Sequence, residues 1–276
     1  MGVKVLYIGE IVGKAGIFCV KTLLPEIKKT LNPDFIIANG EGATGGFGLG
    51  KNHSIYLKKL GIDVLTGGEK IYYKKDLVPH MAKASYILRP ANYPPGNPGR
   101  GWRVYGLPGG RKIAVICLLG QTGFPRVHLS NPYTFLPDIV ARLKEETPII
   151  VLDFHAATTA EKQTMFYHGG PLLSAVFGSH GKVQTSDEGV LKEGAAVITD
   201  AGRTGSQVSV GGLDSRIEID KFLTQIPERS QDAWEFPELQ GLFVEIGEDG
   251  KALSAERIKI PCKEVPHDRD RNGEGD

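Results

Sequence analysis

Ile149-Ile-Val-Leu-Asp-Phe-His-Ala-Ala-Thr-Thr-Ala-Glu-Lys162 is the stretch that decides the predicted fold. Its aliphatic, β-branched beginning, residues 149–152, is typical of a buried parallel strand. This strand ends at Asp153 and His155, just before a threonine-rich sequence that favours the start of a helix. Binding sites of open α/β sheets lie outside the carboxyl ends of the strands. Asp153 and His155 are therefore the first candidates for a functional role.

Three other predicted strands also end in polar side chains. Tyr7-Ile-Gly-Glu10 and Phe35-Ile-Ile-Ala-Asn-Gly-Glu41 end in carboxylates, and Ser174-Ala-Val-Phe-Gly-Ser-His-Gly-Lys182 ends in His180 flanked by glycine. Two carboxylates and two imidazoles at neighbouring strand ends are suitable ligands for a divalent metal. The sequence thus predicts a metal site formed by Glu10, Glu41, His155 and His180.

The order of elements predicts an α/β fold with a parallel sheet followed by a second sheet. Strands and helices alternate in the first part of the chain, at residues 3–8, 18–31, 35–38, 52–60, 62–65 and 74–82. A glycine-rich loop is predicted over residues 9–16, and residues 87–101 are expected to run irregularly across the surface. The second sheet begins with strands at 102–106 and 112–119, and late strands are predicted at 214–220 and 242–246.

Composition excludes several classes of protein. The chain has 276 residues, of which 41% are hydrophobic, enough for one large α/β domain, predicted at residues 1–262. A formal net charge of +1 argues against general nucleic-acid binding, and the sequence has no apolar run of about 18 residues that could span a membrane. Three widely spaced cysteines indicate buried thiols and a cytoplasmic location. Residues 263–276 are highly charged and predicted to be disordered.

Two glycine-rich patterns and one aspartate allow more than one interpretation. Gly40-Glu-Gly-Ala-Thr-Gly45 matches a dinucleotide-binding pattern, but no helix is predicted to follow at once. Gly45, Gly50 and Lys51 have the spacing of a phosphate-binding loop, but Asn52 stands where serine or threonine is required. A flexible glycine loop near the site is the favoured interpretation. Asp153 either orients a ligating histidine or caps the strand end, and the cap is favoured.

Nearly the whole chain, from Val3 to Cys262, resembles the YmdB-like bacterial metallophosphoesterases, a branch of the calcineurin-like phosphoesterases. The resemblance rests on Ile8-Gly-Glu-Ile-Val-Gly-Lys14, Ala38-Asn-Gly-Glu-Gly-Ala-Thr-Gly-Gly-Phe-Gly48, Arg89-Pro-Ala-Asn-Tyr-Pro94, Pro98-Gly-Arg-Gly101, Asp153-Phe-His-Ala156, Thr158-x-x-Glu-Lys162, Val183-Gln-Thr185, Thr199-Asp200 and Asp214-Ser215. It implies a four-layer α/β/β/α sandwich of the metallophosphoesterase type, a two-metal site and phosphodiesterase activity on substrates such as 2′,3′-cyclic nucleotides. It also implies a tendency to form homo-oligomers.

The sequence departs from the family pattern at the positions that carry the chemistry. Where the family has aspartate, this chain has Glu10; Gly68 and Glu69 replace the family's asparagine and catalytic histidine; and Lys182 replaces a metal-binding histidine. An ammonium group repels a cation, so we expect the first metal site to be lost and Lys182 to pair with Glu10 or Glu41. The second site retains Glu41, His155 and His180, with Glu69 as a fourth ligand. We expect it to hold at most one manganese, iron or zinc ion, or none.

These departures leave two functional interpretations. The favoured one is a catalytically silent or strongly impaired member, retained for binding a nucleotide, another phosphodiester or a protein partner, or for assembly. The alternative is a phosphodiesterase with a single metal, in which Lys182 or Arg100 would stabilise negative charge on the phosphoryl oxygens. A metal-free polar cluster, with the histidines hydrogen-bonded to Glu10 and Glu41, is a third arrangement compatible with the sequence.

Overall fold

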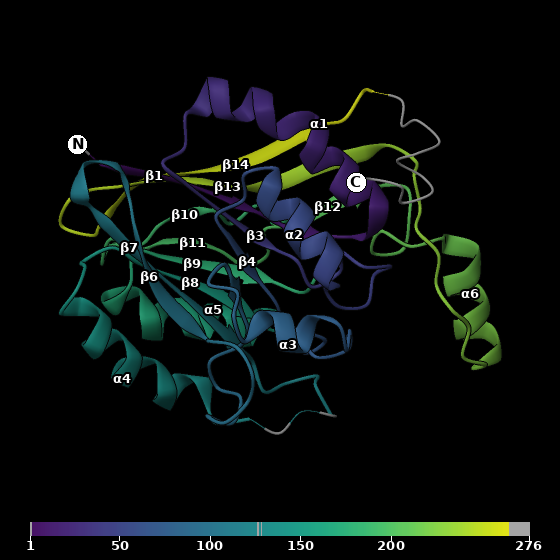
Figure 1. Ribbon diagram of the computed structural model, residues 1–276, viewed down its shortest axis with the longest axis horizontal. Coiled ribbons are helices and arrows are strands. Elements are labelled where there is room, and N and C mark those ends of the chain that lie inside the picture. Colours follow the sequence, from purple (N-terminus) through teal and green to yellow (C-terminus); the bar gives the residue numbers. More distant parts are fainter. Residues whose placement is uncertain (1, 126, 128, 265–276) are drawn as a thin grey trace.

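Two β-sheets packed face to face form the centre of the protein (Figure 1). The computed structural model describes residues 2–125, 127 and 129–264. The larger sheet has the order β2-β12-β13-β1-β3-β4-β5, with β14 paired to β13, and the smaller has the order β10-β11-β9-β8-β7-β6. The strands of the larger sheet are β1 (Val3–Ile8), β2 (Glu10–Ile11), β3 (Phe35–Asn39), β4 (Val64–Thr66), β5 (Ile87–Leu88), β12 (Arg203–Ser206), β13 (Pro237–Ile246) and β14 (Ala252–Pro261). Those of the smaller sheet are β6 (Trp102–Gly106), β7 (Lys112–Leu119), β8 (Ile150–His155), β9 (Ala175–Ser179), β10 (Gly189–Val190) and β11 (Ala196–Ile198).

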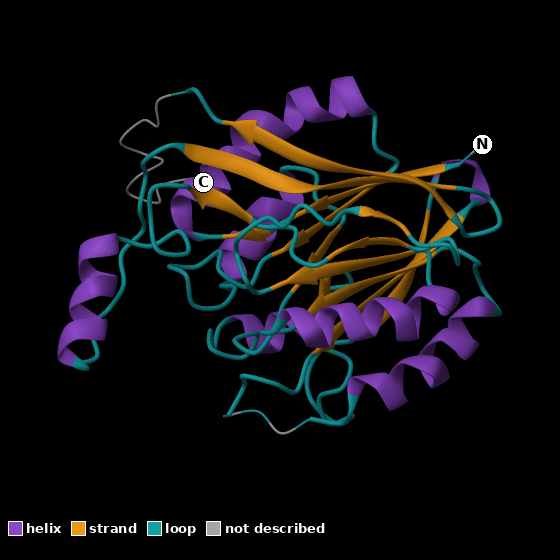
Figure 2. Ribbon diagram, turned by 180° about the vertical axis from the view of Figure 1, so that it is seen from behind, coloured by secondary structure: helices purple, strands orange, loops and turns teal. Residues whose placement is uncertain are grey.

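Helices cover the outer faces of both sheets, which gives the four layers that the resemblance implies (Figure 2). The helices α1 (Gly13–Leu31), α2 (Lys51–Lys59) and α3 (Leu77–Met81) share one hydrophobic core with the larger sheet. The helices α4 (Pro132–Lys144) and α5 (Thr159–Gly169) share another with the smaller sheet. A third core of aliphatic and aromatic side chains fills the space between the two sheets. The fold is therefore an α/β/β/α sandwich.

The parallel strands bring their carboxyl ends together at one edge of the sandwich. In the smaller sheet, β8 lies between β7 and β9, and His155 pairs in register with Leu119 and Ser179. In the larger sheet, β3 pairs in parallel with β1 and β4, and Asn39 lies beside Thr66. Because the two sheets face each other, side chains from both can meet at this edge.

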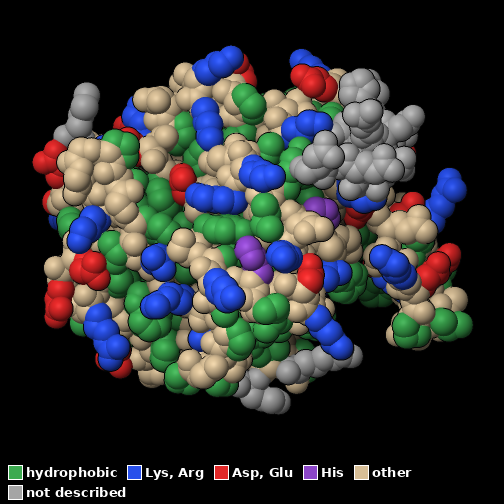
Figure 3. Space-filling view, in the orientation of Figure 1, with side chains coloured by type: hydrophobic (Ala, Val, Ile, Leu, Met, Phe, Trp, Pro, Cys, Tyr) green, Lys and Arg blue, Asp and Glu red, His purple; other side chains and the backbone are tan. Residues whose placement is uncertain are grey.

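Two predicted elements are wrong. The chain from Ser215 to Thr224 is a helix, α6, and not a strand. The alternation Arg216-Ile-Glu-Ile-Asp220 suggested a strand, but the Asp214 carboxylate accepts hydrogen bonds from the backbone N–H groups of Arg216 and Ile217 and caps a helix. Helix α6 projects from the body and exposes apolar side chains at its end (Figure 3). The predicted loop over residues 9–16 is also shorter than expected, because α1 begins at Gly13.

The proline-rich segment 87–101 is not confined to the surface as predicted. It begins with β5 and continues with the buried residues Arg89 and Asn92. The Asn92 side chain both donates to and accepts from the backbone of Leu119, at 2.8 and 3.0 Å, and so fixes this segment against the end of β7.

Three expectations concern other features of the chain. All three cysteines are buried free thiols, as predicted. No helix in the described ranges has both the length and the apolar character needed to cross a bilayer. The predicted tail from residue 263 lies, beyond Glu264, outside the described residues, and the assignment of residues 1–262 to one domain stays a prediction.

Candidate metal centre

Glu69, His155 and His180 come together at the edge where the parallel strands end. Glu69 follows β4, His155 is the last residue of β8, and His180 follows β9. The Nε2 atom of His155 lies 2.9 Å from Oε2 of Glu69 and 3.2 Å from Nδ1 of His180, and Glu69 Oε2 lies 3.7 Å from His180 Nδ1. The imidazole of His155 is fully buried, whereas the side chain of His180 is 28% exposed. The cluster therefore has a buried inner side and an accessible outer side.

These three side chains fit one divalent cation. Two imidazole nitrogens and one carboxylate oxygen are the protein ligands of many catalytic sites for zinc and iron, which keep a further position open. Ligand distances of about 2.0–2.2 Å place tetrahedral ligand atoms about 3.3–3.6 Å apart. The separations of 2.9, 3.2 and 3.7 Å lie close to this range, so small side-chain rotations are enough to bind an ion.

His155 is held in place by side chains from both sheets. Its Nδ1 lies 2.9 Å from Ser179 Oγ, which in turn donates a 2.7 Å hydrogen bond to Asp153. Asn39 and Thr66 from the larger sheet also donate to Asp153. Asp153 is thus not the strand-end cap that we favoured; it acts through Ser179 to orient the imidazole. With Nδ1 donating to Ser179, Nε2 points into the cluster and can bind a metal ion once it has lost its proton.

Gly68 is required for the present position of His155. A Cβ atom at residue 68 would lie 2.2 Å from Cδ2 and 2.4 Å from Nε2 of His155, far inside van der Waals contact. The imidazole therefore occupies the space in which the side chain of any other residue at this position would begin. The absence of a side chain at Gly68 is therefore what allows His155 to pack here.

The loop carrying His180 and Lys182 has an unusual backbone. Both residues have positive φ angles, 92° and 60°, a conformation that few residues other than glycine adopt. Asp200 stabilises the loop by accepting hydrogen bonds from the Gly181 N–H at 2.7 Å and from the Lys162 ammonium at 2.6 Å. Such strained loops are often found at functional sites, where the surrounding contacts impose the geometry.

Charges within the cluster shift the pKa values of its members. Burial alone would raise the pKa of Glu69, but the hydrogen bond and charge of His155, with the Lys70 ammonium 3.0 Å away, hold it well below its usual range. For His155, burial acts to lower the pKa, but Glu69 outweighs burial and raises it. Burial and the neighbouring His155 charge lower the pKa of His180 to about 3. His180 is therefore neutral at pH 7, as a metal ligand must be.

The other two predicted carboxylates have different partners. The Glu41 carboxylate accepts hydrogen bonds from the backbone N–H groups of Gly68 and Lys70, and burial followed by the charge of Glu69 raises its pKa to about 7. Glu10 is only 1% exposed, and its Oε1 lies 3.3 Å from the Lys182 ammonium. The expected pairing of Lys182 with one of these two glutamates therefore involves Glu10.

The YmdB-like family profile matches residues 6–258 of this chain. The chain belongs to the YmdB-like family. It is 36% identical over 258 residues to a 2′,3′-cyclic-nucleotide 2′-phosphodiesterase of Bacillus subtilis (strain 168), a match that covers 93% of this chain and 97% of that protein. The family is one of metallophosphoesterases, which bind divalent metals.

Solved structures agree with this assignment. A phosphatase of Mycoplasma pneumoniae superposes with a TM-score of 0.88 and 28% identity, covering 95% of this chain and 94% of that one. A 5′-nucleotidase precursor of Thermus thermophilus matches with a TM-score of 0.55 and 13% identity, covering 95% of this chain and 54% of its own. The second likeness shows the shared fold alone.

Arg100, predicted to contact phosphoryl oxygens, lines a cavity elsewhere in this YmdB-like chain. That cavity has a volume of about 600 Å³ and lies against α4, with Phe135 and Arg142 in its wall. None of Glu69, His155 and His180 lines it. The structure therefore does not bring Arg100 into the cluster, and its role in substrate binding stays a prediction.

Sequence reasoning missed several residues of the site. Lys70, which pairs with Glu69, directly follows a predicted ligand, and Ser179 directly precedes another. Phe124 packs against both imidazoles, with ring centroids 6.2 Å from His155 and 5.0 Å from His180. Proximity in sequence could have indicated Lys70 and Ser179, but nothing in the sequence around Phe124 connects it with the strand ends.

Proposed function

We propose that this chain is a phosphodiesterase that uses one divalent metal ion and acts on nucleotides such as 2′,3′-cyclic nucleotides. The observation that carries the proposal is the convergence of Glu69, His155 and His180 on one accessible point. The relative from Bacillus subtilis, a 2′,3′-cyclic-nucleotide 2′-phosphodiesterase, supports the substrate class. Mn²⁺, Fe²⁺ and Zn²⁺ all accept this mixed set of nitrogen and oxygen ligands.

The residues of the chain divide the work of such a reaction. A bound divalent ion would supply Lewis-acid polarisation of a phosphoryl oxygen. Ser179 and Asp153 hold His155 in the orientation that binding requires. Lys70 lies next to the cluster, and its ammonium is placed to offset the negative charge that develops on the phosphate. Phe124 packs its ring against both imidazoles and helps to hold them in position.

The same geometry limits the rate that we expect. The resemblance assigns the position of Glu69 to the family's catalytic histidine, and a positioned general acid contributes about 10²–10⁴-fold in rate. Here that position is taken by a carboxylate whose pKa is strongly lowered, so it holds no proton to donate at pH 7. We therefore infer slower hydrolysis than in a family member with the complete two-metal site.

A second candidate function is nucleotide binding without hydrolysis. It is favoured by the ion pair between Glu10 and Lys182, because an ammonium beside a buried carboxylate competes with any cation there. Under this alternative, the Glu69 cluster would bind a metal or a phosphate group but would not turn over the ligand.

Metal content and turnover separate the two functions. The purified chain is loaded with Mn²⁺, dialysed and analysed for metal, and hydrolysis of bis-p-nitrophenyl phosphate and 2′,3′-cyclic AMP is then followed. The proposal requires one ion per chain and a turnover that His180→Ala abolishes, with His168→Ala as a control at an exposed histidine outside the cluster. One ion without turnover would support the binding function. Turnover that survives His180→Ala would contradict both functions: hydrolysis would then occur, but without the Glu69, His155 and His180 cluster.

A further inference from the structure

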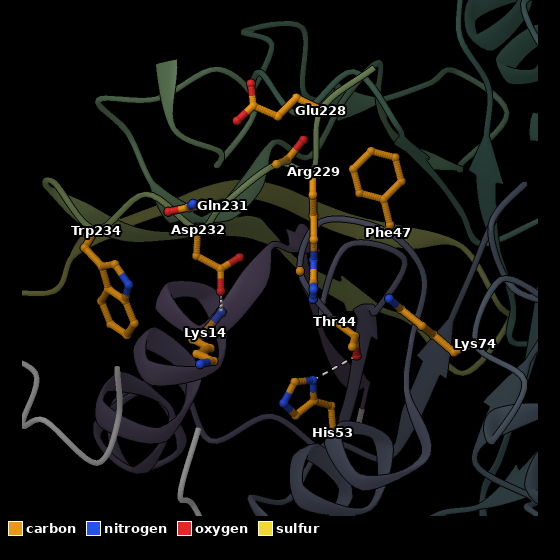
Figure 4. Close-up of a pocket in the computed structure, with 12 residues that line it drawn as sticks. Lys14, Thr44, Phe47, His53, Lys74, Glu228, Arg229, Gln231, Asp232 and Trp234 are labelled. Carbon is orange, nitrogen blue, oxygen red and sulfur yellow. Dashed lines mark hydrogen bonds between the residues drawn. The ribbon is translucent and has the colours of Figure 1, made fainter. Parts of the chain in front are cut away.

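A second cavity, of about 850 Å³, lies beside the glycine-rich loop that joins β3 to α2 (Figure 4). Thr44, Gly45 and Phe47 of this loop line it, together with residues that precede β13. None of the three residues of the metal cluster belongs to its wall. The cavity therefore does not include the cluster, although the ring centroid of its wall residue Phe47 lies 5.5 Å from the ammonium of Lys70, the partner of Glu69. It is formed in part by the loop whose pattern resembled nucleotide-binding motifs.

Cationic side chains converge on this cavity. Lys74 and Arg229 reach from different elements toward Thr44, while the carboxylate of Glu228 is turned away from them (Figure 4). Across the residues that the structure describes, no ion pair or hydrogen bond engages the Lys74 or Arg229 head group. Two cations that line one cavity and have no ion-pair partner among the described residues favour the binding of an anion, and phosphate is the anion best suited to a lysine and an arginine together.

The wall of the cavity also has features that fit a nucleoside. The Asp232 carboxylate binds the start of α1: Oδ2 accepts a 3.0 Å hydrogen bond from the N–H of Lys14, and the buried Oδ1 lies against Gly13. The aromatic side chains of Phe47 and Trp234 stand at two sides of the cavity (Figure 4), and Phe47 is 41% exposed. Bases stack on such surfaces.

We propose that this cavity binds a nucleoside phosphate. Lys74 and Arg229 would hold the phosphate, and an aromatic side chain would contact the base. The proposal does not depend on hydrolysis at the metal cluster. It assigns a role to Thr44, Gly45 and Phe47, which are not ligands of the metal cluster.

Calorimetric titration of the full chain with AMP in the presence of EDTA tests the proposal. AMP should bind the unmodified chain in EDTA, when the metal cluster holds no ion. Binding should weaken by about tenfold or more in a Lys74→Ala/Arg229→Ala variant, since two charge-assisted contacts are lost. Lys75→Ala, at the neighbouring exposed lysine that does not line the cavity, should leave binding unchanged. Adenosine and inorganic phosphate should each bind more weakly than AMP.

Three results would overturn the proposal. AMP affinity that is the same in the double variant and the unmodified chain would show that the cations do not hold the phosphate. AMP binding that requires added Mn²⁺ would place the ligand at the metal cluster. Phosphate that binds as tightly as AMP would show a site for small anions, with no recognition of the nucleoside.

Discussion

Glu69 and Glu10 are two carboxylates at the same edge of the sandwich, and they have opposite kinds of partner. Glu69 faces two imidazoles, His155 and His180, whereas Glu10 faces the Lys182 ammonium. A neutral imidazole offers a lone pair to a metal, while an ammonium has three donors and no acceptor. One region is therefore suited to bind a cation, and in the other a side-chain cation is already present. The comparison shows that single residues, and not the fold, decide which half of the site can bind metal.

Removing an imidazole from the first region should have the largest effect. We expect His155→Ala to weaken Mn²⁺ binding by more than about 100-fold, since loss of a mere supporting partner already costs about 10–100-fold. Isothermal titration with Mn²⁺ measures this, with His168→Ala as the matched control, because His168 is exposed and hydrogen-bonds to the backbone of Tyr133. Unchanged Mn²⁺ affinity in His155→Ala would mean that His155 does not bind the ion and that the Glu69 region is no better suited to a metal than the Glu10 region.

Removing the ammonium from the second region should destabilise the fold. In Lys182→Met the Glu10 carboxylate, 1% exposed, loses its partner, and breaking a buried ion pair costs about 3–5 kcal/mol. We expect the lower end, about 3 kcal/mol, because the Lys182 side chain is 16% exposed. Urea unfolding measures the free energy.

The matched control for Lys182→Met is the double variant Glu10→Gln/Lys182→Met, which has neither charge and should recover most of the lost stability. If the single variant is as stable as the double variant, the ion pair does not hold this region together.

A methyl group at Gly68 tests how tightly the first region is packed. Gly68→Ala places a carbon 2.4 Å from His155 Nε2, so the imidazole must move from its present position. We expect a loss of about 1–3 kcal/mol in stability from overpacking, together with weaker Mn²⁺ binding. Gly96→Ala is the control, since a Cβ there meets nothing within 4 Å. Normal Mn²⁺ affinity in Gly68→Ala would show that the imidazole position is not critical.

Much of this comparison could be predicted from the sequence, because strand ends are local features. The apolar runs that end at His155 and before His180 correctly indicated which residues lie at the edge of the sheets. The family resemblance correctly predicted the layers, and the positive charge of Lys182 was enough to predict a carboxylate partner.

The rest depends on contacts between distant segments. Glu41 stays a predicted ligand, but no pattern around it reveals that its oxygens accept hydrogen bonds from backbone N–H groups of the loop after β4. The interpretation of Asp153 was wrong because the two donors from the larger sheet, Asn39 and Thr66, are more than 80 residues away in sequence. Helix α6 was mistaken for a strand because its alternating pattern outweighed the capping signal of Asp214.

The smallest expected effect concerns the support of His155. Ser179→Ala removes the hydroxyl between Nδ1 of His155 and Asp153 but leaves Glu69, His155 and His180 in place. Because loss of such a partner frees the imidazole to rotate and lowers its basicity, we expect Mn²⁺ affinity to fall by about 10-fold. Asp153 keeps its hydrogen bonds from Asn39 and Thr66, so the stability should change by only about 1 kcal/mol.

Ser186→Ala is the matched control, because Ser186 is exposed on the segment that follows Lys182. Titration with Mn²⁺ and urea unfolding on the same samples separate orientation from stability. A large loss of stability with unchanged metal affinity would make Ser179 a packing residue of the two sheets. A loss of affinity without unfolding would show that the first region binds metal because Asp153, acting through Ser179, fixes the imidazole of His155. The described hydrogen bonds include no such support for the side chains of Glu10 and Lys182.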